Sequence, residues 1–177
     1  MPKISEAVKH DHALIKNVYH RLAAASPEDR KSDEFIWKLD RYLIVDDLLV
    51  TPALERYVVH GGKERHRRLS DDYDSASLHK LRRMQTFDPA EDSFESSLKA
   101  IWVDLEPHIR EESTRDLEHL EENMSESESE ALAKKYEGIK QLLQQPYGED
   151  GAPDARTLSA ILEMPRQELR VKIGLSQ

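Results

Sequence analysis

The chain has 177 residues, no cysteine and a formal net charge of −9. The lack of cysteine excludes disulfide bonds and thiolate metal sites, so any metal site must use nitrogen and oxygen ligands. The acidic balance argues against a nucleic-acid-binding surface, because phosphate binding needs clustered lysine and arginine side chains.

Apolar residues recur at helical spacing through almost the whole chain, which has only six glycines and eight prolines. No stretch alternates apolar and polar residues as a strand does. The sequence therefore predicts an all-α protein. It contains no apolar segment suited to a signal peptide or a membrane span, so we expect a cytoplasmic protein without membrane contact.

The first predicted helix spans residues 5–25, with Ser5 as its N-cap. Val8 and His12 are four residues apart and share its apolar face. His10 lies off that face, so we expect it in solvent and His12 in the core.

The second predicted helix begins near residue 32 and carries Leu39 and Tyr42 on its inner face. Asp46 continues the same series, where an apolar residue is expected. Pro52 lies further along the run and should kink the helix, because proline removes a backbone donor and clashes with the preceding turn.

The third predicted helix, residues 63–84, has the weakest apolar stripe, with His66 and Tyr73 on its inner face. Residue 73 falls near the middle of this helix. Tyr73 is therefore a candidate for the same interior as Tyr42. His66, on the same face, is a second candidate.

The fourth predicted helix spans residues 90–122, and its apolar stripe includes Leu105. His108 and Glu112 continue the stripe four residues apart, so both side chains leave the same face. A buried imidazole beside a buried carboxylate is costly unless a partner such as a metal cation compensates it. Pro107 should distort the helix at this level.

Ser125 and Glu128 have the spacing of a capping box and predict the start of a fifth helix. Residues 145–153 read as an irregular loop, followed by short helices at 157–163 and 165–173. We expect a helical bundle over residues 1–145. Residues 146–177 should form a loop and short C-terminal helices packed on the same domain.

Long helices joined by short turns predict an up-down-up-down four-helix bundle. Antiparallel helices of similar length bring their midpoints together. The inner polar groups near those midpoints are His12, Tyr42, Asp46, Tyr73, His108 and Glu112. Their convergence predicts a site inside the bundle.

Three motifs resemble the hemerythrin-like, or HHE cation-binding, family, especially its longer fungal members. They are Val8-Lys9-His10-Asp11-His12, the stretch from Arg41 to Glu55, and Pro107-His108-Ile109-Arg110-Glu111-Glu112. The resemblance covers nearly the whole chain. It implies a bundle holding a non-haem di-iron centre, with metal ligands at His12, Asp46, His108 and Glu112. Asp46 stands where the family has a bridging glutamate.

Three positions depart from the family pattern in ways that bear on function. Tyr42 stands where the second motif has histidine, and Tyr73 where the third helix usually offers one. Asp150 stands at the histidine position of the loop after the fifth helix. We therefore treat Tyr42, Tyr73 and Asp150 as candidate catalytic groups, while their roles as ligands or packing residues stay open.

Three functional interpretations follow from this altered site. The first is an oxidoreductase that uses iron, mononuclear or dinuclear, or manganese on a small organic substrate, with dioxygen as an optional co-substrate. An oxygen carrier is disfavoured, since hard oxygen ligands favour the higher oxidation state. The second is a metal-independent cyclase, isomerase or dehydratase that uses the same groups as acids and bases. The third is a binding or sensing protein without chemistry.

Overall fold

The computed structural model describes residues 1–58 and 79–175, and within these ranges every regular element is a helix. The predicted all-α bundle is thus confirmed. The bundle is built from α1 (Ile4–Ala24), α2 (Ser32–Val45), η2 (Asp46–Val50), α3 (Thr51–Tyr57), α5 (Asp92–Glu111), η3 (Glu112–Asp116), α6 (Leu117–Asn123) and α7 (Glu126–Gln144). Beside it are two 3-10 turns and two short helices, η1 (Pro27–Asp29), η4 (Gln145–Tyr147), α8 (Ala155–Glu163) and α9 (Arg166–Lys172).

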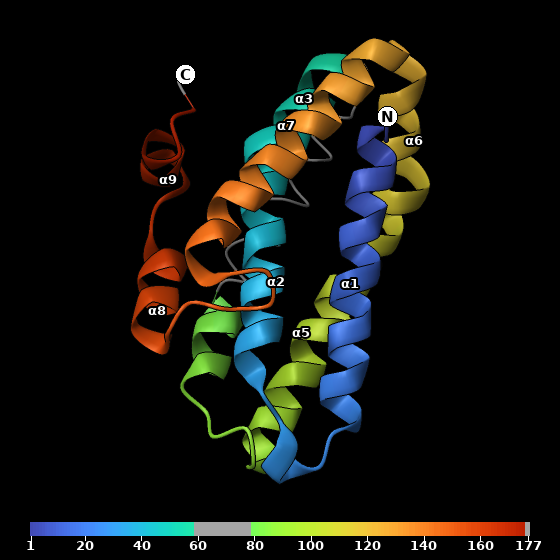
Figure 1. Ribbon diagram of the computed structural model, residues 1–177. Helices are drawn as coiled ribbons and strands as arrows, with labels where there is room; N and C mark the ends of the chain where they lie inside the picture. Colours follow the sequence, from blue (N-terminus) through green and yellow to red (C-terminus); the bar gives the residue numbers. More distant parts are fainter. Residues whose placement is uncertain (59–78, 176–177) are drawn as a thin grey trace.

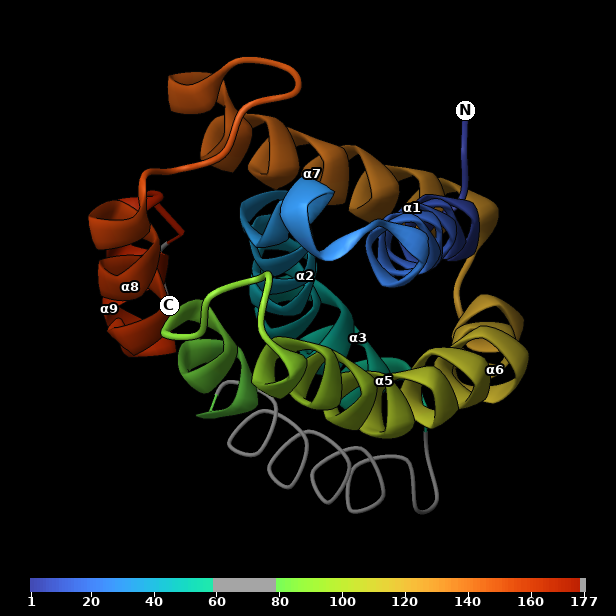
Figure 2. The same cartoon turned by 90° about the horizontal axis from the view of Figure 1, so that it is seen from below.

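Within the described residues, four helical rods surround one interior: α1, α2 with α3, α5 with α6, and α7 (Figures 1 and 2). α1 packs against both α2 and α7, and α2 also packs against α7. Side chains from all four rods form one continuous apolar core that includes Ile15, Tyr42, Leu105 and Tyr136. The predicted third helix, 63–84, lies mostly outside the described residues. Its last part, within residues 79–85, is helical.

The start of α1 differs by one residue from the predicted start. The helix begins at Ile4 with Lys3 at the cap position, so Ser5 is not the N-cap. Neighbouring helices satisfy the first backbone donors, because Ile4 N–H donates to Ser129 Oγ at 3.0 Å and Ser5 N–H donates to the Glu121 carboxylate at 3.0 Å. These tertiary contacts add to a local one, in which the Lys3 N–H donates to the Glu6 carboxylate at 2.8 Å. The capping box at the start of α7, by contrast, forms as predicted.

Two rods contain a π-helical turn, and each turn begins at a carboxylate residue that was predicted to bind metal. In η2 the Thr51 N–H donates to the Asp46 carbonyl, and in η3 the Leu117 N–H donates to the Glu112 carbonyl. Both hydrogen bonds span five residues instead of four. Such turns insert one residue into a helix and are frequent at functional sites.

The predicted distortion at Pro107 is wrong in its position. Pro107 lies inside α5, which continues without interruption to Glu111, and the irregular turn starts one residue later. Pro107 is exposed and so is the Val103 side chain, one turn earlier. Proline has no backbone N–H, so the Val103 carbonyl four residues earlier lacks its usual helical donor. This carbonyl lies on the solvent side of α5, where water can bind it. Pro52, which was predicted to kink the second helix, follows the π-helical turn η2 in the first turn of α3 within the same rod, so the helix is irregular next to this proline.

The C-terminal helices α8 and α9 lie outside the bundle next to α2 (Figure 2). α8 contributes the fully buried Leu158 and Leu162 to the main core. α9 packs on η2, and the Arg166 Nε donates to Asp47 Oδ2 at 3.0 Å. Within residues 1–58 and 79–175, none of the helices is both long and apolar enough to cross a bilayer.

Candidate metal centre

The four predicted metal ligands come together in the bundle interior. Asp46, His108 and Glu112 each offer a ligand atom, and these atoms all lie within 4.8 Å of one another. His12 joins this group through Glu112, since its Nε2 lies 2.7 Å from Glu112 Oε2. The exposed fraction is 4% for His12, 4% for Asp46 and 1% for Glu112. These side chains are therefore shielded from bulk water, which strengthens the electrostatic interactions among them.

Glu112, at the first position of η3, is the carboxylate on which the cluster converges. Its Oε2 contacts His12 Nε2, accepts a hydrogen bond from the Tyr42 hydroxyl, and lies 3.8 Å from His108 Nε2. Burial opposes ionisation of Glu112. The hydrogen bond from His12 and the charges of His12 and His108 outweigh this cost and hold the pKa of Glu112 below its usual range.

Tyr42 is placed at the centre of the site by α2. Its hydroxyl oxygen lies 3.1 Å from His12 Nε2 and 3.2 Å from His108 Nε2, in addition to the hydrogen bond that it donates to Glu112. The rings of His12 and Tyr42 meet edge to face with centroids 5.3 Å apart. Tyr42 thus contacts three of the four proposed ligands, and its catalytic role stays a prediction.

The other oxygen of Glu112 has an unusual environment. Glu112 Oε1 is buried and accepts no hydrogen bond from an N–H or O–H group of the described residues. The Asp46 carboxylate interacts with Glu112, and both belong to the group of ligand atoms within 4.8 Å. Two buried carboxylates this close need a shared proton or a cation.

Comparison with known proteins agrees with this geometry. Residues 3–120 match the family described as the hemerythrin HHE cation binding domain. The chain belongs to this family. An uncharacterized hemerythrin-like protein of Schizosaccharomyces pombe is 26% identical over 176 residues, covering 96% of this chain and 86% of the relative. No solved structure gives a significant match.

The donor set of this hemerythrin-like chain fits a metal ion. Metal bonds to nitrogen and oxygen ligands are about 2.1 Å long, so donors up to about 4.3 Å apart can share one ion. The spacing of Asp46, His108 and Glu112 needs only a small contraction to reach that range. Imidazole and carboxylate ligands without sulfur suit iron and manganese. Asp46, His108 and Glu112 would hold the ion, with His12 as a fourth ligand.

Ser113, which sequence reasoning missed, orients the His12 ring. Its hydroxyl lies 2.8 Å from His12 Nδ1 on the side away from Glu112. A hydroxyl can donate or accept, so Ser113 can support either tautomer of His12. In metal sites a partner of this kind fixes the histidine ring and leaves Nε2 available to the ion. Its position directly after Glu112 in η3 is the one signal that the sequence offered.

A second buried layer links α1 to α7 beside the site. Asp11 accepts a hydrogen bond from the Tyr136 hydroxyl at 2.8 Å and one from Lys140 Nζ at 2.6 Å. Burial raises the pKa of Tyr136, and the negative charges of Asp11, Asp46 and Glu112 raise it further. Tyr136 is therefore a phenol that donates. No sequence pattern pointed to this role of Tyr136 or Lys140.

The remaining predicted residues lie away from the cluster or outside the described residues. Tyr73 and His66 belong to the undescribed stretch 59–78. Asp150 lies in the loop after η4 and is exposed, whereas the cluster is buried. The structure therefore does not bring Asp150 together with His12, Asp46, His108 and Glu112. His10 and His20 are exposed, and the expectation that His10 lies off the inner face of α1 is confirmed.

Proposed function

We propose that this protein binds iron or manganese in the bundle interior and is an oxidoreductase acting on a small organic substrate. The observation that carries the proposal is the pair of buried carboxylates, Asp46 and Glu112, beside His108. A histidine-and-carboxylate set with open positions is the arrangement used by non-haem iron oxygenases. The bound ion would supply the redox chemistry.

The residues around the ion have separable roles in this proposal. His12, Asp46, His108 and Glu112 bind it, and Ser113 orients His12. Tyr42 holds a proton at its hydroxyl oxygen between the two imidazoles and Glu112. The apolar core excludes bulk water, which strengthens each of these electrostatic contacts.

Elemental analysis of protein purified without chelators tests the metal site. We expect about one ion of iron or manganese per chain in the wild type and an affinity loss of more than about 100-fold in Glu112→Gln, which keeps the shape but removes the charge. Glu118→Gln, an exposed glutamate on α6, is the matched control and should keep the metal. Equal metal content in both variants would contradict the proposal.

Oxygen uptake with a panel of small organic reductants tests the reaction class. The iron- or manganese-loaded wild type should consume oxygen faster than the chelated protein and faster than Glu112→Gln. Equal rates in all three samples would reject oxidoreductase chemistry while leaving metal binding intact.

One set of contacts favours a second candidate, a metal-independent acid/base enzyme. His12, Tyr42 and Glu112 form a closed hydrogen-bonded unit that could hold and move protons without an ion. Chelated protein that converts a small substrate as fast as the metal-loaded protein would support this candidate over the first.

A further inference from the structure

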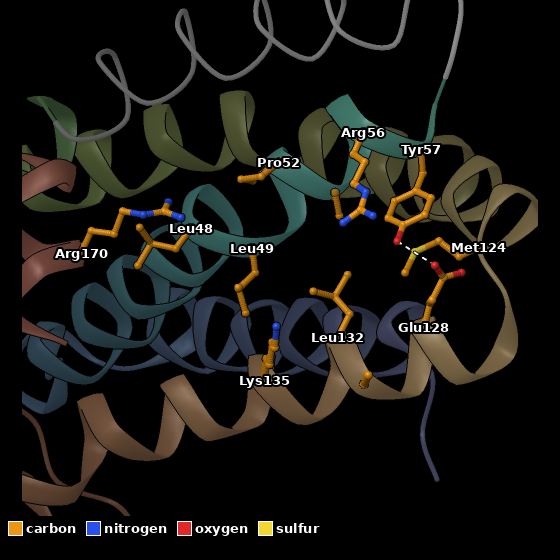
Figure 3. A pocket seen from close by; sticks show the side chains of 12 residues that line it. Leu48, Leu49, Pro52, Arg56, Tyr57, Met124, Glu128, Leu132, Lys135 and Arg170 are labelled. Carbon is orange, nitrogen blue, oxygen red and sulfur yellow. Dashed lines mark hydrogen bonds between the residues drawn. The ribbon is translucent and has the colours of Figure 1, made fainter. Parts of the chain in front are cut away.

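A groove separate from the metal centre opens between α3 and α7, with α9 at one end (Figure 3). Its volume is about 630 Å³, within the range typical of small-molecule sites. The floor is apolar and includes Leu49, Pro52, Met124 and Leu132. In Figure 3 Leu49 and Leu132 point into the space from opposite sides. This floor can hold a hydrocarbon segment and keep it from water.

The rim of the groove is cationic although the whole chain carries a net charge of −9. Arg56 from α3, Lys135 from α7 and Arg170 from α9 all line it. The Lys135 ammonium and the Arg56 guanidinium point into the space between the helices (Figure 3). Neither Lys135 nor Arg170 has an ion-pair partner among residues 1–58 and 79–175. Three helices thus direct positive charge to one opening.

The carboxylate that lines the groove already has a hydrogen-bond partner. Glu128 is the one carboxylate among the described lining residues, and it accepts a hydrogen bond from the Tyr57 hydroxyl at 3.0 Å. The Arg56 guanidinium stacks over the Tyr57 ring at 5.1 Å, so the Tyr57 side chain fixes both neighbours at this end. The cations at the middle and at the α9 end remain available to a ligand.

We propose that this groove binds a small amphipathic anion, a carboxylate with an extended hydrocarbon tail, independently of the metal centre. The tail would lie on the apolar floor between Leu49 and Leu132, and the carboxylate would pair with Lys135 and Arg170. An inorganic anion would leave the floor unused, and a neutral hydrocarbon would leave the cations unused. Only a ligand with both a hydrocarbon tail and an anionic group uses the apolar floor and the cations together.

Isothermal titration of the full chain with dodecanoate, below its micellar concentration, tests this assignment. Dodecyltrimethylammonium and inorganic phosphate are the comparison ligands, since one has the tail without the negative charge and the other has the charge without the tail. We expect dodecanoate to bind at least about tenfold more tightly than either. Equal affinity for dodecanoate and dodecyltrimethylammonium would overturn the proposal.

Two independent variants locate the site. Lys135→Glu combined with Arg170→Glu should weaken dodecanoate binding by about tenfold or more, because attraction becomes repulsion. Lys16→Glu, an exposed lysine on α1, is the matched control and should bind as the wild type does. Ala131→Trp places a large side chain at an exposed position lining the groove and should also block binding. Unchanged dodecanoate binding in both groove variants would overturn the proposal. The measurements are made with and without chelator, because the groove is proposed to bind independently of the metal centre.

Discussion

By the resemblance drawn from the sequence, Tyr42 stands at a position where the hemerythrin pattern has histidine. Its hydroxyl oxygen lies within 3.2 Å of both His12 Nε2 and His108 Nε2. Imidazole can offer a lone pair to a metal, whereas a protonated phenol donates a hydrogen bond to Glu112. We therefore expect Tyr42 to hold a proton rather than to bind the metal ion.

Replacing Tyr42 by phenylalanine should destabilise the metal-free protein. Glu112 Oε2 would lose one of its two donors inside the core, which typically costs about 1–3 kcal/mol. Urea unfolding of the chelated protein measures the effect. Tyr19→Phe is the control, because the Tyr19 hydroxyl has no hydrogen bond within the described residues. Equal losses in the two variants would show that the hydrogen bond to Glu112 contributes nothing.

At the residue scale, the sequence predicted which polar side chains lie in the bundle interior better than it predicted the residues around them. His12, His108 and Glu112 stand at helical spacing on apolar stripes, and burial at such positions follows from the period of the helix. Ser113 and Lys140 could not be found in the same way. Their roles depend on which helix packs beside which, and that is a tertiary property without a local pattern.

Among the helical elements, α7 supplies an interaction that the sequence did not reveal. Lys140 is buried and reaches across to Asp11 on α1, and both side chains are less than 10% exposed. A buried ion pair stabilises little relative to an apolar pair, but removing one partner leaves a buried charge. The pair therefore specifies how α1 and α7 align more than it strengthens the bundle.

Replacing Lys140 by methionine should lower the free energy of unfolding by about 3 kcal/mol, since Asp11 would remain buried without its cation. Adding Asp11→Leu to Lys140→Met should recover most of that loss. Urea unfolding of the wild type, both single variants and the double variant forms a double-mutant cycle. Simple additivity of the two single losses would contradict the proposed coupling.

Another buried carboxylate, Asp40 of α2, lies next to Arg166 of α9. It is fully buried, Arg166 Nη2 lies 3.6 Å from its Oδ1, and neither of its oxygens accepts a hydrogen bond from the described residues. Burial raises the pKa of Asp40 from 3.8 to about 6, against the opposing charges of Arg166 and Arg82. Nearby Asp47 adds to the rise.

This shift makes stability depend on pH in a defined direction. Well below pH 3.8 Asp40 is protonated in both the folded and the unfolded state, and between 3.8 and about 6 it is ionised mainly in the unfolded state. The resulting loss of stability reaches about 3 kcal/mol above pH 6, since one pKa unit corresponds to about 1.4 kcal/mol. Asp40→Asn should therefore gain stability relative to the wild type as pH rises from 4 to 7. Urea unfolding at several pH values measures this. A difference in free energy of unfolding between Asp40→Asn and the wild type that stayed constant with pH would contradict it.

At the scale of the whole molecule, composition and periodicity were sufficient for the fold class. Helical spacing throughout the chain and the family motifs predicted an all-helical bundle with short C-terminal helices, and the described residues contain these elements. The two π-helical turns were not predictable from spacing. An inserted residue changes the helical register without leaving a composition signal, and Pro107, the expected cause, lies on the exposed side of α5.

The fold as a whole brings side chains of three rods to one buried point, where we propose that a metal ion binds. Crystals soaked in manganese, measured at a wavelength where manganese scatters anomalously, test this proposal most directly. We expect one strong anomalous peak bonded to Asp46, His108 and Glu112, with His12 beside it. A peak elsewhere on the protein, or no peak after soaking in excess manganese, would contradict it.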